Sequence, residues 1–145
     1  MLLGALLAMP AAAAPPLAHR EVLPSGVVLL VAERPAVPIV VLQIAVPGGS
    51  VRDPADALGL ANLTADSITR GTTQRSGPEL DRAIEFVGGS LEAGAGRDGA
   101  TLFLSVLKKD LPLGLDLLAE VLLHPAFPAD EVTRKIGEIQ AGLRR

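Results

Sequence analysis

The sequence contains no cysteine, tryptophan or tyrosine, only three phenylalanines, and only two histidines. The lack of cysteine excludes disulfides, thiolate nucleophiles and cysteine-based zinc sites. Because aromatic residues make up 2% of the chain, a hydrophobic core must consist of leucine, valine, isoleucine and alanine. Basic runs are also missing, and the formal charge is −3. These features argue against binding to nucleic acid or to an anionic membrane surface.

The first 14 residues differ from the rest of the chain. An apolar run over residues 2–9 is followed by small residues with A-x-A matches, which is typical of a secretory signal segment cleaved near Ala14. The run is too short to span a bilayer, which needs roughly 20 apolar residues. Charges, prolines or glycines interrupt the other apolar runs. We therefore expect export to the bacterial periplasm or beyond, and no membrane-spanning helix.

The remaining residues are enough for one domain at most, with residues 15–24 as an extended lead-in. Two apolar runs follow, at residues 27–32 and 37–47, and an S-G pair before the first of them predicts a turn. Their β-branched content and the Pro-containing loop between them predict two buried, neighbouring strands. Since polar residues hardly interrupt either run, we expect both faces of these strands to be covered.

Capping residues mark the first two helices. One helix can begin at Asp53 or after Gly59, and Gly71 ends it. The second begins with an S-x-x-E capping box formed by Ser76 and Glu79, and it ends at a glycine pair. Both helices therefore have defined ends in the sequence.

Strands and helices alternate again in the second half of the chain. Residues 91–95 and 101–107 predict a hairpin, followed by a helix over residues 110–124 that is apolar almost all round and must be largely buried. A more polar helix begins near residue 128 and runs to the last residue without a stop signal. The predicted order is β-β-α-α-β-β-α-α. We expect an α+β fold, in which an antiparallel sheet has helices packed on one face.

Most of the motifs that could support chemistry are missing. The sequence has no G-x-S-x-G, and the glycine-rich residues 48–50 and 94–99 match no phosphate-binding loop, so they predict turns. His19 has no ligand partner at helical spacing. Glu120 lies four residues before His124, but an ordinary helix-end contact explains that pair better than a metal site does.

The helix near residue 60 has a polar face. Asn62, Asp66 and Arg70 recur at every fourth residue and therefore share one side of the helix. Asp66 precedes Arg70 by four, which predicts a helical ion pair worth about 0.2–0.5 kcal/mol. By physics alone this is a modest polar stripe. The residues expected to face the core are Leu60, Leu63 and Ile68.

From residue 25 onward, the order of several segments resembles the insulinase/pitrilysin family of zinc metallopeptidases, which includes the mitochondrial processing peptidases. No single segment is decisive, but their order and spacing together are specific. The segments are SGVVLLVAERP, PGGSVRDP, GLANLTADSITRGT, SGPELDRAIEFVGGSLEAGAGRDG and HPAFPADEV.

The resemblance implies a catalytic site that this chain lacks. Active members have an H-x-x-E-H motif, in which the two histidines bind zinc and the glutamate activates water. Here Asn62 and Asp66 stand at the histidine positions, and Ala65 stands at the position of the base. The family's third ligand, a glutamate on a downstream helix, falls around Ala141 and Gly142, which have no side chain that can bind zinc.

The resemblance therefore implies a degenerate member without a metal or other cofactor, whose own enzyme activity is doubtful. We expect residues 25–145 to be the N-terminal part of an inverted-zincin peptidase-like half-domain, truncated at its C-terminus and poorly stable alone. The expected partner is a homologous active peptidase subunit, with a peptide substrate shared between the two. Two alternatives remain open at this stage. One is an active metalloendopeptidase that uses Asp66 and Glu138 in an altered metal site, and the other is a scaffold module without a proteolytic role.

Overall fold

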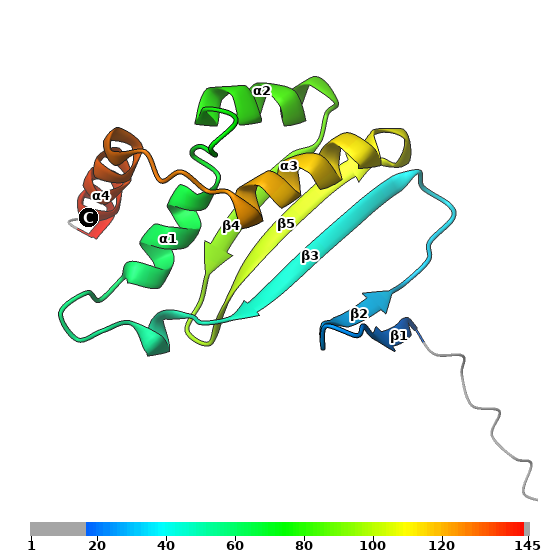
Figure 1. Cartoon of the computed structure of the whole chain (residues 1–145), viewed down its shortest axis with the longest axis horizontal. Helices are drawn as coiled ribbons and strands as arrows, with labels where there is room; N and C mark the ends of the chain where they lie inside the picture. The colour runs from blue at the N-terminus through cyan, green and yellow to red at the C-terminus, as the bar shows by residue number, and fades with distance from the viewer. Residues whose placement is uncertain (1–16, 144–145) are drawn as a thin grey trace, which may run out of the picture. The chain divides into compact units, whose positions relative to one another are not determined.

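The computed structural model describes residues 17–143, which divide into two units, residues 17–37 and residues 38–143. Figure 1 shows the elements in chain order. Three strands precede the first helix, one more than the sequence predicts. In order, the elements are β1 (His19–Val22), β2 (Val28–Val31), β3 (Ile39–Pro47), the 3-10 turn η1 (Ser50–Arg52), α1 (Leu60–Ile68), α2 (Gly77–Phe86), β4 (Ser90–Ala95), β5 (Gly99–Leu107), the 3-10 turn η2 (Lys108–Asp110), α3 (Leu111–Leu123) and α4 (Ala129–Leu143).

The first unit contains an antiparallel hairpin of β1 and β2, with His19 opposite Val31. The turn closes at Gly26, whose φ of +86° lies in the left-handed region that favours glycine. The Gly26 amide donates to the Leu23 carbonyl at 2.8 Å. The turn predicted at the S-G pair is therefore confirmed, and the extended lead-in contains β1.

The predicted pairing of the two apolar runs is wrong, because β2 pairs with β1 whereas β3 pairs with β5. The expected burial is wrong as well. All residues of β1 and β2 are exposed, and β3 alternates between exposed and half-buried residues as far as Ile44, so only one of its faces is covered. An apolar run indicates a strand but does not specify its neighbour. The short loop at Gly26 makes β1 the nearest partner for β2, at a small cost in loop-closure entropy.

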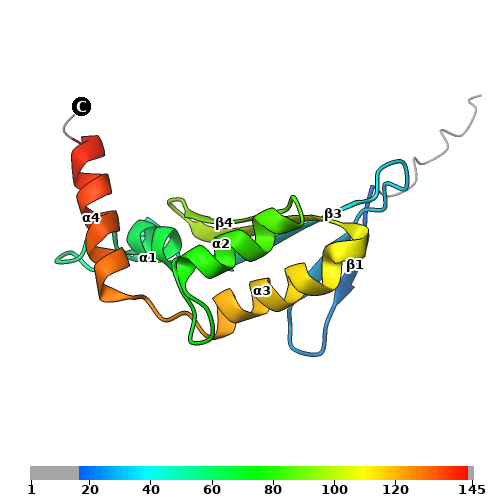
Figure 2. The ribbon, with the colours of Figure 1, turned by 90° about the horizontal axis from the view of Figure 1, so that it is seen from above.

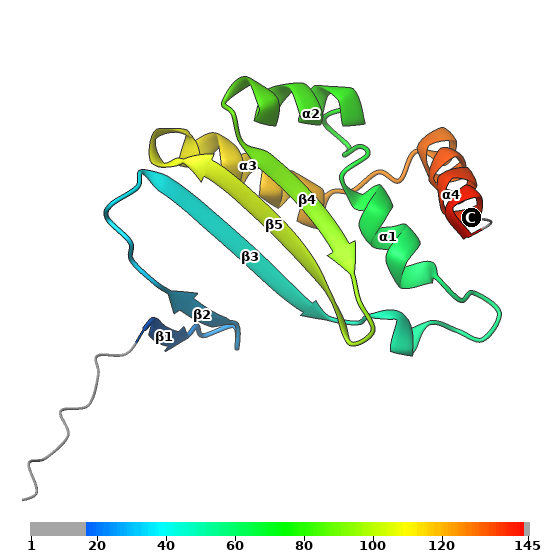
Figure 3. The same ribbon diagram turned by 180° about the vertical axis from the view of Figure 1, so that it is seen from behind.

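The second unit is built on an antiparallel sheet with the strand order β3-β5-β4. β5 pairs with β3 along its whole length, from Gly99 opposite Pro47 to Leu107 opposite Ile39. β4 and β5 form the predicted hairpin, in which Ala95 lies opposite Ala100 beside the loop. Figure 3 shows the three strands side by side, with β5 in the middle.

Helices α2 and α3 cover one face of this sheet and lie on the same side of it in Figure 2. Leu102, Leu104 and Val106 alternate along β5 and are buried, whereas the residues between them are only half-buried. This alternation, together with apolar stripes on the two helices, confirms the predicted α+β class with helices packed on one face. The helix residues of the buried core are Leu80, Ile84, Leu117, Leu118 and Val121.

The apolar helix α3 is buried along one side only. Leu117 and Val121 are 0% exposed, but Leu115 is 43% exposed and Leu123 is 70% exposed. The sequence predicts that this helix is largely buried, but only the stripe of α3 that contacts the sheet is buried. In the part of the chain that the structure describes, no helix combines the length and the apolar content needed to cross a membrane.

Both predicted helix starts use the expected side chains, although Asp53 lies several residues before the first residue of α1. α1 begins at Leu60, yet the Asp53 carboxylate reaches its first turn and accepts hydrogen bonds from the amides of Gly59 and Ala61 at 2.8 and 2.9 Å. Asp53 thus satisfies donors that would otherwise lack partners at the helix end. At α2, the capping box of Ser76 and Glu79 is confirmed.

Candidate functional site

Helix α1 holds the three residues that the family resemblance places at the motif positions. Asn62 is exposed, Ala65 is buried, and Asp66 is half-buried. Ala65 and Asp66 follow Asn62 by three and four residues, so the three residues lie on one side of the helix, which we call the motif face. Of the three side chains, only those of Asn62 and Asp66 have atoms that could bind a metal ion.

Helix α4 packs against α1 and brings the downstream segment next to it (Figure 1). Ala141 and Gly142 are exposed on this helix, as is Glu138. The Glu138 carboxylate already contacts the Arg134 guanidinium and lies 3.0 Å from the Lys135 Nζ atom. The hydrogen bond from Lys135, followed by the charge of Arg134, lowers the pKa of Glu138 below its ordinary value. Within residues 17–143, no group of three or more His, Asp or Glu side chains is placed to hold a metal ion.

The predicted ion pair between Asp66 and Arg70 is wrong. The Arg70 guanidinium instead lies 3.3 Å from the Asp81 carboxylate of α2, and it also donates to the Thr69 hydroxyl. Spacing along one helix cannot reveal a carboxylate on the next helix, and Asp81 lies beside the C-terminal end of α1. Arg70 therefore links α1 to α2, while Asp66 forms no ion pair within the described part of the chain.

A buried polar cluster, missed at the sequence level, follows α1. It consists of Thr72, Arg75 and Glu120, and we call it the α1–α3 cluster. The Glu120 carboxylate contacts the Arg75 guanidinium and accepts a hydrogen bond from the Thr72 hydroxyl at 3.3 Å. The Thr72 oxygen in turn accepts the amide of Arg75 at 2.9 Å. The sequence does contain one indication that Glu120 is buried. Glu120 follows Leu117 by three residues and so falls on the core side of an otherwise apolar helix.

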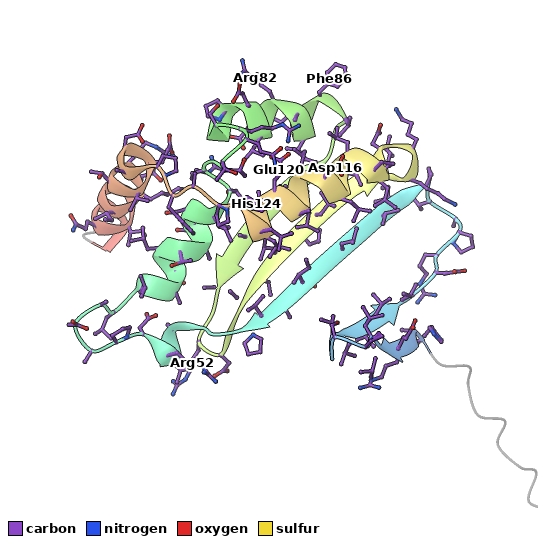
Figure 4. The ribbon with its side chains drawn as sticks, viewed as in Figure 1. Arg52, Arg82, Phe86, Asp116, Glu120 and His124 are labelled. Carbon is purple, nitrogen blue, oxygen red and sulfur yellow. The ribbon has the colours of Figure 1, made fainter. Side chains whose placement is uncertain are left out.

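This cluster also explains the pair formed by Glu120 and His124. Figure 4 labels Glu120 on α3 and His124 directly after it, and the Glu120 side chain contacts Arg75. His124 is exposed, and its backbone closes the helix: its amide donates to the Glu120 carbonyl at 2.9 Å. Its carbonyl accepts the Thr73 amide at 3.0 Å. Both residues therefore have structural contacts, and these fasten the turn after α1 to the end of α3.

The two glycine-rich segments contact each other through backbone hydrogen bonds. The Ser50 amide donates to the Gly96 carbonyl at 2.9 Å, and the Val51 amide donates to the Arg97 carbonyl at 3.0 Å. Gly49 is buried at this contact, where backbone atoms of the other segment leave no room for a Cβ. The predicted turns are confirmed at residues 48–50 and 96–98, whereas residues 94, 95 and 99 belong to β4 and β5.

A pocket of about 440 Å³ lies between α1, η1, the end of α3 and the covered face of the sheet. We call it the α1 pocket. Its walls are mostly apolar, and its two charged residues are Arg52 and Asp53. Five helix residues form the α1 wall, namely Leu60, Ala61, Thr64, Ala65 and Ile68, so the pocket reaches the buried member of the motif face. The other lining residues are Val46, Pro47, Gly48, Gly49, Ala93, Ala100, Thr101, Leu102 and Leu122.

The model of the insulinase family (peptidase family M16) matches residues 28–144, which is most of the chain. The chain belongs to this family.

Several relatives match most or much of the chain. An uncharacterized zinc protease of Mycobacterium tuberculosis (strain ATCC 25618 / H37Rv) is 34% identical over 123 residues, which cover 85% of this chain and 28% of the relative. Cytochrome b-c1 complex subunit 2 of Saccharomyces cerevisiae is 35% identical over 95 residues, with coverages of 66% and 25%. Mitochondrial-processing peptidase subunit beta of Dictyostelium discoideum is 32% identical over 83 residues, with coverages of 57% and 18%. The chain thus spans less than a third of the length of these relatives.

Two solved structures share the fold. The crystal structure of a peptidase M16 inactive domain from Pseudomonas fluorescens has a TM-score of 0.81 and 28% identity, and it aligns with 86% of this chain and 31% of that chain. The crystal structure of pitrilysin has a TM-score of 0.75 and 24% identity, with coverages of 87% and 14%. These likenesses confirm the peptidase-family fold that the sequence predicts.

Proposed function

We propose that this chain is a non-catalytic member of the insulinase family, which pairs with a zinc-containing homologue and shares a peptide substrate with it. The observation that supports this most is the set of side chains on the motif face of α1. Asn62, Ala65 and Asp66 stand where active members have two zinc ligands and a general base. Apart from these side chains, the described residues share the fold of the family.

The donors at these positions do not fit a catalytic zinc ion. Asn62 offers a neutral amide, and Asp66 offers one carboxylate, whereas catalytic zinc sites use three protein ligands of higher affinity. Ala65 has no group that can accept a proton from water. On α4, Ala141 and Gly142 supply no side-chain donor. We therefore assign no water activation to this chain.

An altered metal site built from Asp66 and Glu138 is a weaker proposal. A metal ion at Glu138 would have to displace the contacts that its carboxylate makes with Arg134 and Lys135. Calorimetric titration of the full chain with Zn²⁺ or Mn²⁺ separates the two proposals. We expect no saturable heat at millimolar metal, whereas a one-site isotherm that Asp66→Ala abolishes would favour the altered site.

The names of the relatives support the pairing. Two of them are named as subunits, one of the mitochondrial-processing peptidase and one of the cytochrome b-c1 complex, and a structural neighbour is described as an inactive domain. We also propose that the chain acts in the periplasm or outside the cell, because residues 1–14 have the composition of a secretory signal segment. Those residues lie outside the part that the structure describes.

Co-expression tests this function. The full chain, tagged, is produced with an H-x-x-E-H homologue from the same organism, and the complex is assayed on a peptide library. We expect the two to copurify and the hydrolysis rate to exceed that of the homologue alone. A homologue with its motif glutamate changed to glutamine should lose all activity in the complex. Zinc-dependent cleavage by this chain alone would contradict the proposal, and stable partners that include no family member would favour the scaffold.

A further inference from the structure

The α1 pocket is large enough to hold a ligand and is built for an apolar one. Its volume of about 440 Å³ falls within the range of about 300–1,000 Å³ that is typical of small-ligand sites. Small side chains keep it open on both sides. Ala61 and Ala65 line the helix wall, and Ala93 and Ala100 line the sheet floor. A larger apolar residue at any of these four positions would fill the space from within.

Of the two charged residues that line the pocket, Arg52 is the one that can donate hydrogen bonds to a ligand. Both carboxylate oxygens of Asp53 accept backbone amides, from Gly59 and Ala61, so this acidic group is already satisfied. Arg52 is exposed at the end of η1, and in the described range it takes part in none of the ion pairs. A guanidinium is the preferred partner of a carboxylate, because it can donate two parallel hydrogen bonds to it.

We infer that the α1 pocket binds the C-terminal end of a peptide, with the terminal aliphatic side chains among its apolar walls and the terminal carboxylate at Arg52. This deepens the proposed function and rests on it, since a glutamate at position 65 would place a negative charge in the same wall. With Ala65 buried there instead, the α1 wall carries no charge and does not itself repel an anionic ligand. The position of the base in an active member thus becomes part of a binding surface.

Fluorescence polarisation on the full chain tests the role of the carboxylate. The probe is a fluorescein-labelled hexapeptide that ends in Leu-Leu, either as the free acid or as the C-terminal amide. We expect the free acid to bind about tenfold more tightly, as the loss of one charge-assisted contact implies. Arg52→Gln should weaken the free acid about tenfold and leave the amide unchanged. The matched control is Arg82→Gln, because Arg82 lies on α2, away from the pocket (Figure 4), and it should change neither affinity.

A second pair of variants tests the apolar walls. Ala61→Leu fills the pocket from α1 and should weaken the free acid at least tenfold. Ala119→Leu makes the same change on an exposed position of α3 that does not line the pocket, and it should have no effect. Circular dichroism melting of each variant shows that the fold is retained, and only variants that melt like the parent chain are compared.

The outcomes separate this inference from the proposed function. Equal binding of acid and amide, or full binding by a folded Ala61→Leu variant, overturns the pocket assignment. If octanoate displaces the peptide and binds more tightly than the peptide does, the peptide is not the occupant of the pocket. If either result is obtained while the chain still raises the activity of its zinc-containing homologue, the proposed function stands and only the pocket inference fails. If the homologue test fails but the acid–amide difference and the Arg52 dependence hold, the pocket inference stands alone.

Discussion

Arg75, in the turn after α1, forms an ion pair with Glu120 of α3, whose side chain is 9% exposed. This contact joins the helix with the motif face to the helix that covers the sheet. Because Thr72 also donates to the same carboxylate, both the charge and the lone pairs of Glu120 are satisfied in a buried place. Glu120 therefore helps to fix the turn after α1, together with the backbone hydrogen bond between Thr73 and His124.

Removal of this carboxylate should destabilise the chain. We expect Glu120→Ala to lower the free energy of unfolding by about 1–3 kcal/mol, because Thr72 and the partly exposed Arg75 lose their buried partner. The control is Asp116→Ala, which removes an exposed carboxylate one turn earlier on α3 (Figure 4) and should change stability by less than about 0.5 kcal/mol. Urea unfolding of the full chain measures both. Equal effects of the two variants would show that the α1–α3 cluster does not contribute to the stability of the fold.

The start of α1 should depend on Asp53. Asp53→Ala leaves the amides of Gly59 and Ala61 without their acceptor, and we expect a loss of about 1–2 kcal/mol, as for other helix caps. Asp56, an exposed residue of the same loop, provides the control, because Asp56→Ala removes no helix contact. Hydrogen exchange at the α1 amides is the sharper readout. Faster exchange in Asp53→Ala alone is expected, and unchanged exchange would contradict the cap.

The capping box of α2 should respond to pH. Hydrogen bonds from Ser76, first from its backbone and then from its side chain, lower the pKa of Glu79 from its ordinary value of 4.5 in the folded chain. The unfolded chain lacks these bonds, so the contribution is fully present above pH 4.5 and is lost as the pH falls through the lowered folded value.

Glu79→Gln tests this sign. The variant should unfold at lower urea than the parent chain at pH 7, and the difference should shrink at pH values below 4.5. Glu85→Gln, on an exposed position of the same helix, is the comparison and should change the unfolding midpoint at pH 7 less than Glu79→Gln does. A difference that grows as the pH falls would reverse the assignment.

The contact between the two glycine-rich segments should tolerate no side chain at Gly49. An added Cβ would lie well inside van der Waals contact of the Gly96 and Arg97 carbonyl oxygens, which belong to the backbone and cannot move aside cheaply. We expect Gly49→Ala to cost about 2–3 kcal/mol. Gly94→Ala, where the Cβ would meet nothing within 4 Å, should be close to neutral in the same thermal melts. A neutral Gly49→Ala variant would mean that the two turns are not held together.

Local patterns in the sequence predict most of the helices, strands and turns, because the interactions that define these elements join residues only a few positions apart. The capping box at Ser76, the turn at Gly26 and the β4–β5 hairpin all have short-range causes, and the structure confirms each of them. Their physical basis is side-chain capping, left-handed glycine geometry and loop closure over a few residues.

What the sequence misses depends on contacts between distant segments. β2 has the apolar pattern of a buried strand, but nothing in that pattern specifies β1 as its neighbour. Arg70 has Asp66 at helical spacing, yet Asp81 of the next helix is its partner. The motif face itself was predictable from the spacing of Asn62 and Asp66, whereas the α1 pocket, formed by residues far apart in the sequence, was not.

Zinc content tests the central claim most directly. The full chain and an Asn62→His/Asp66→His variant are purified in zinc-containing buffer, dialysed, and analysed by mass spectrometry for zinc per chain. The variant restores the histidine pair at the family's spacing and serves as the positive control. We expect the parent chain to retain far less than one zinc per chain and the variant to retain more. One zinc per parent chain, lost in Asp66→Ala, would contradict a non-catalytic role.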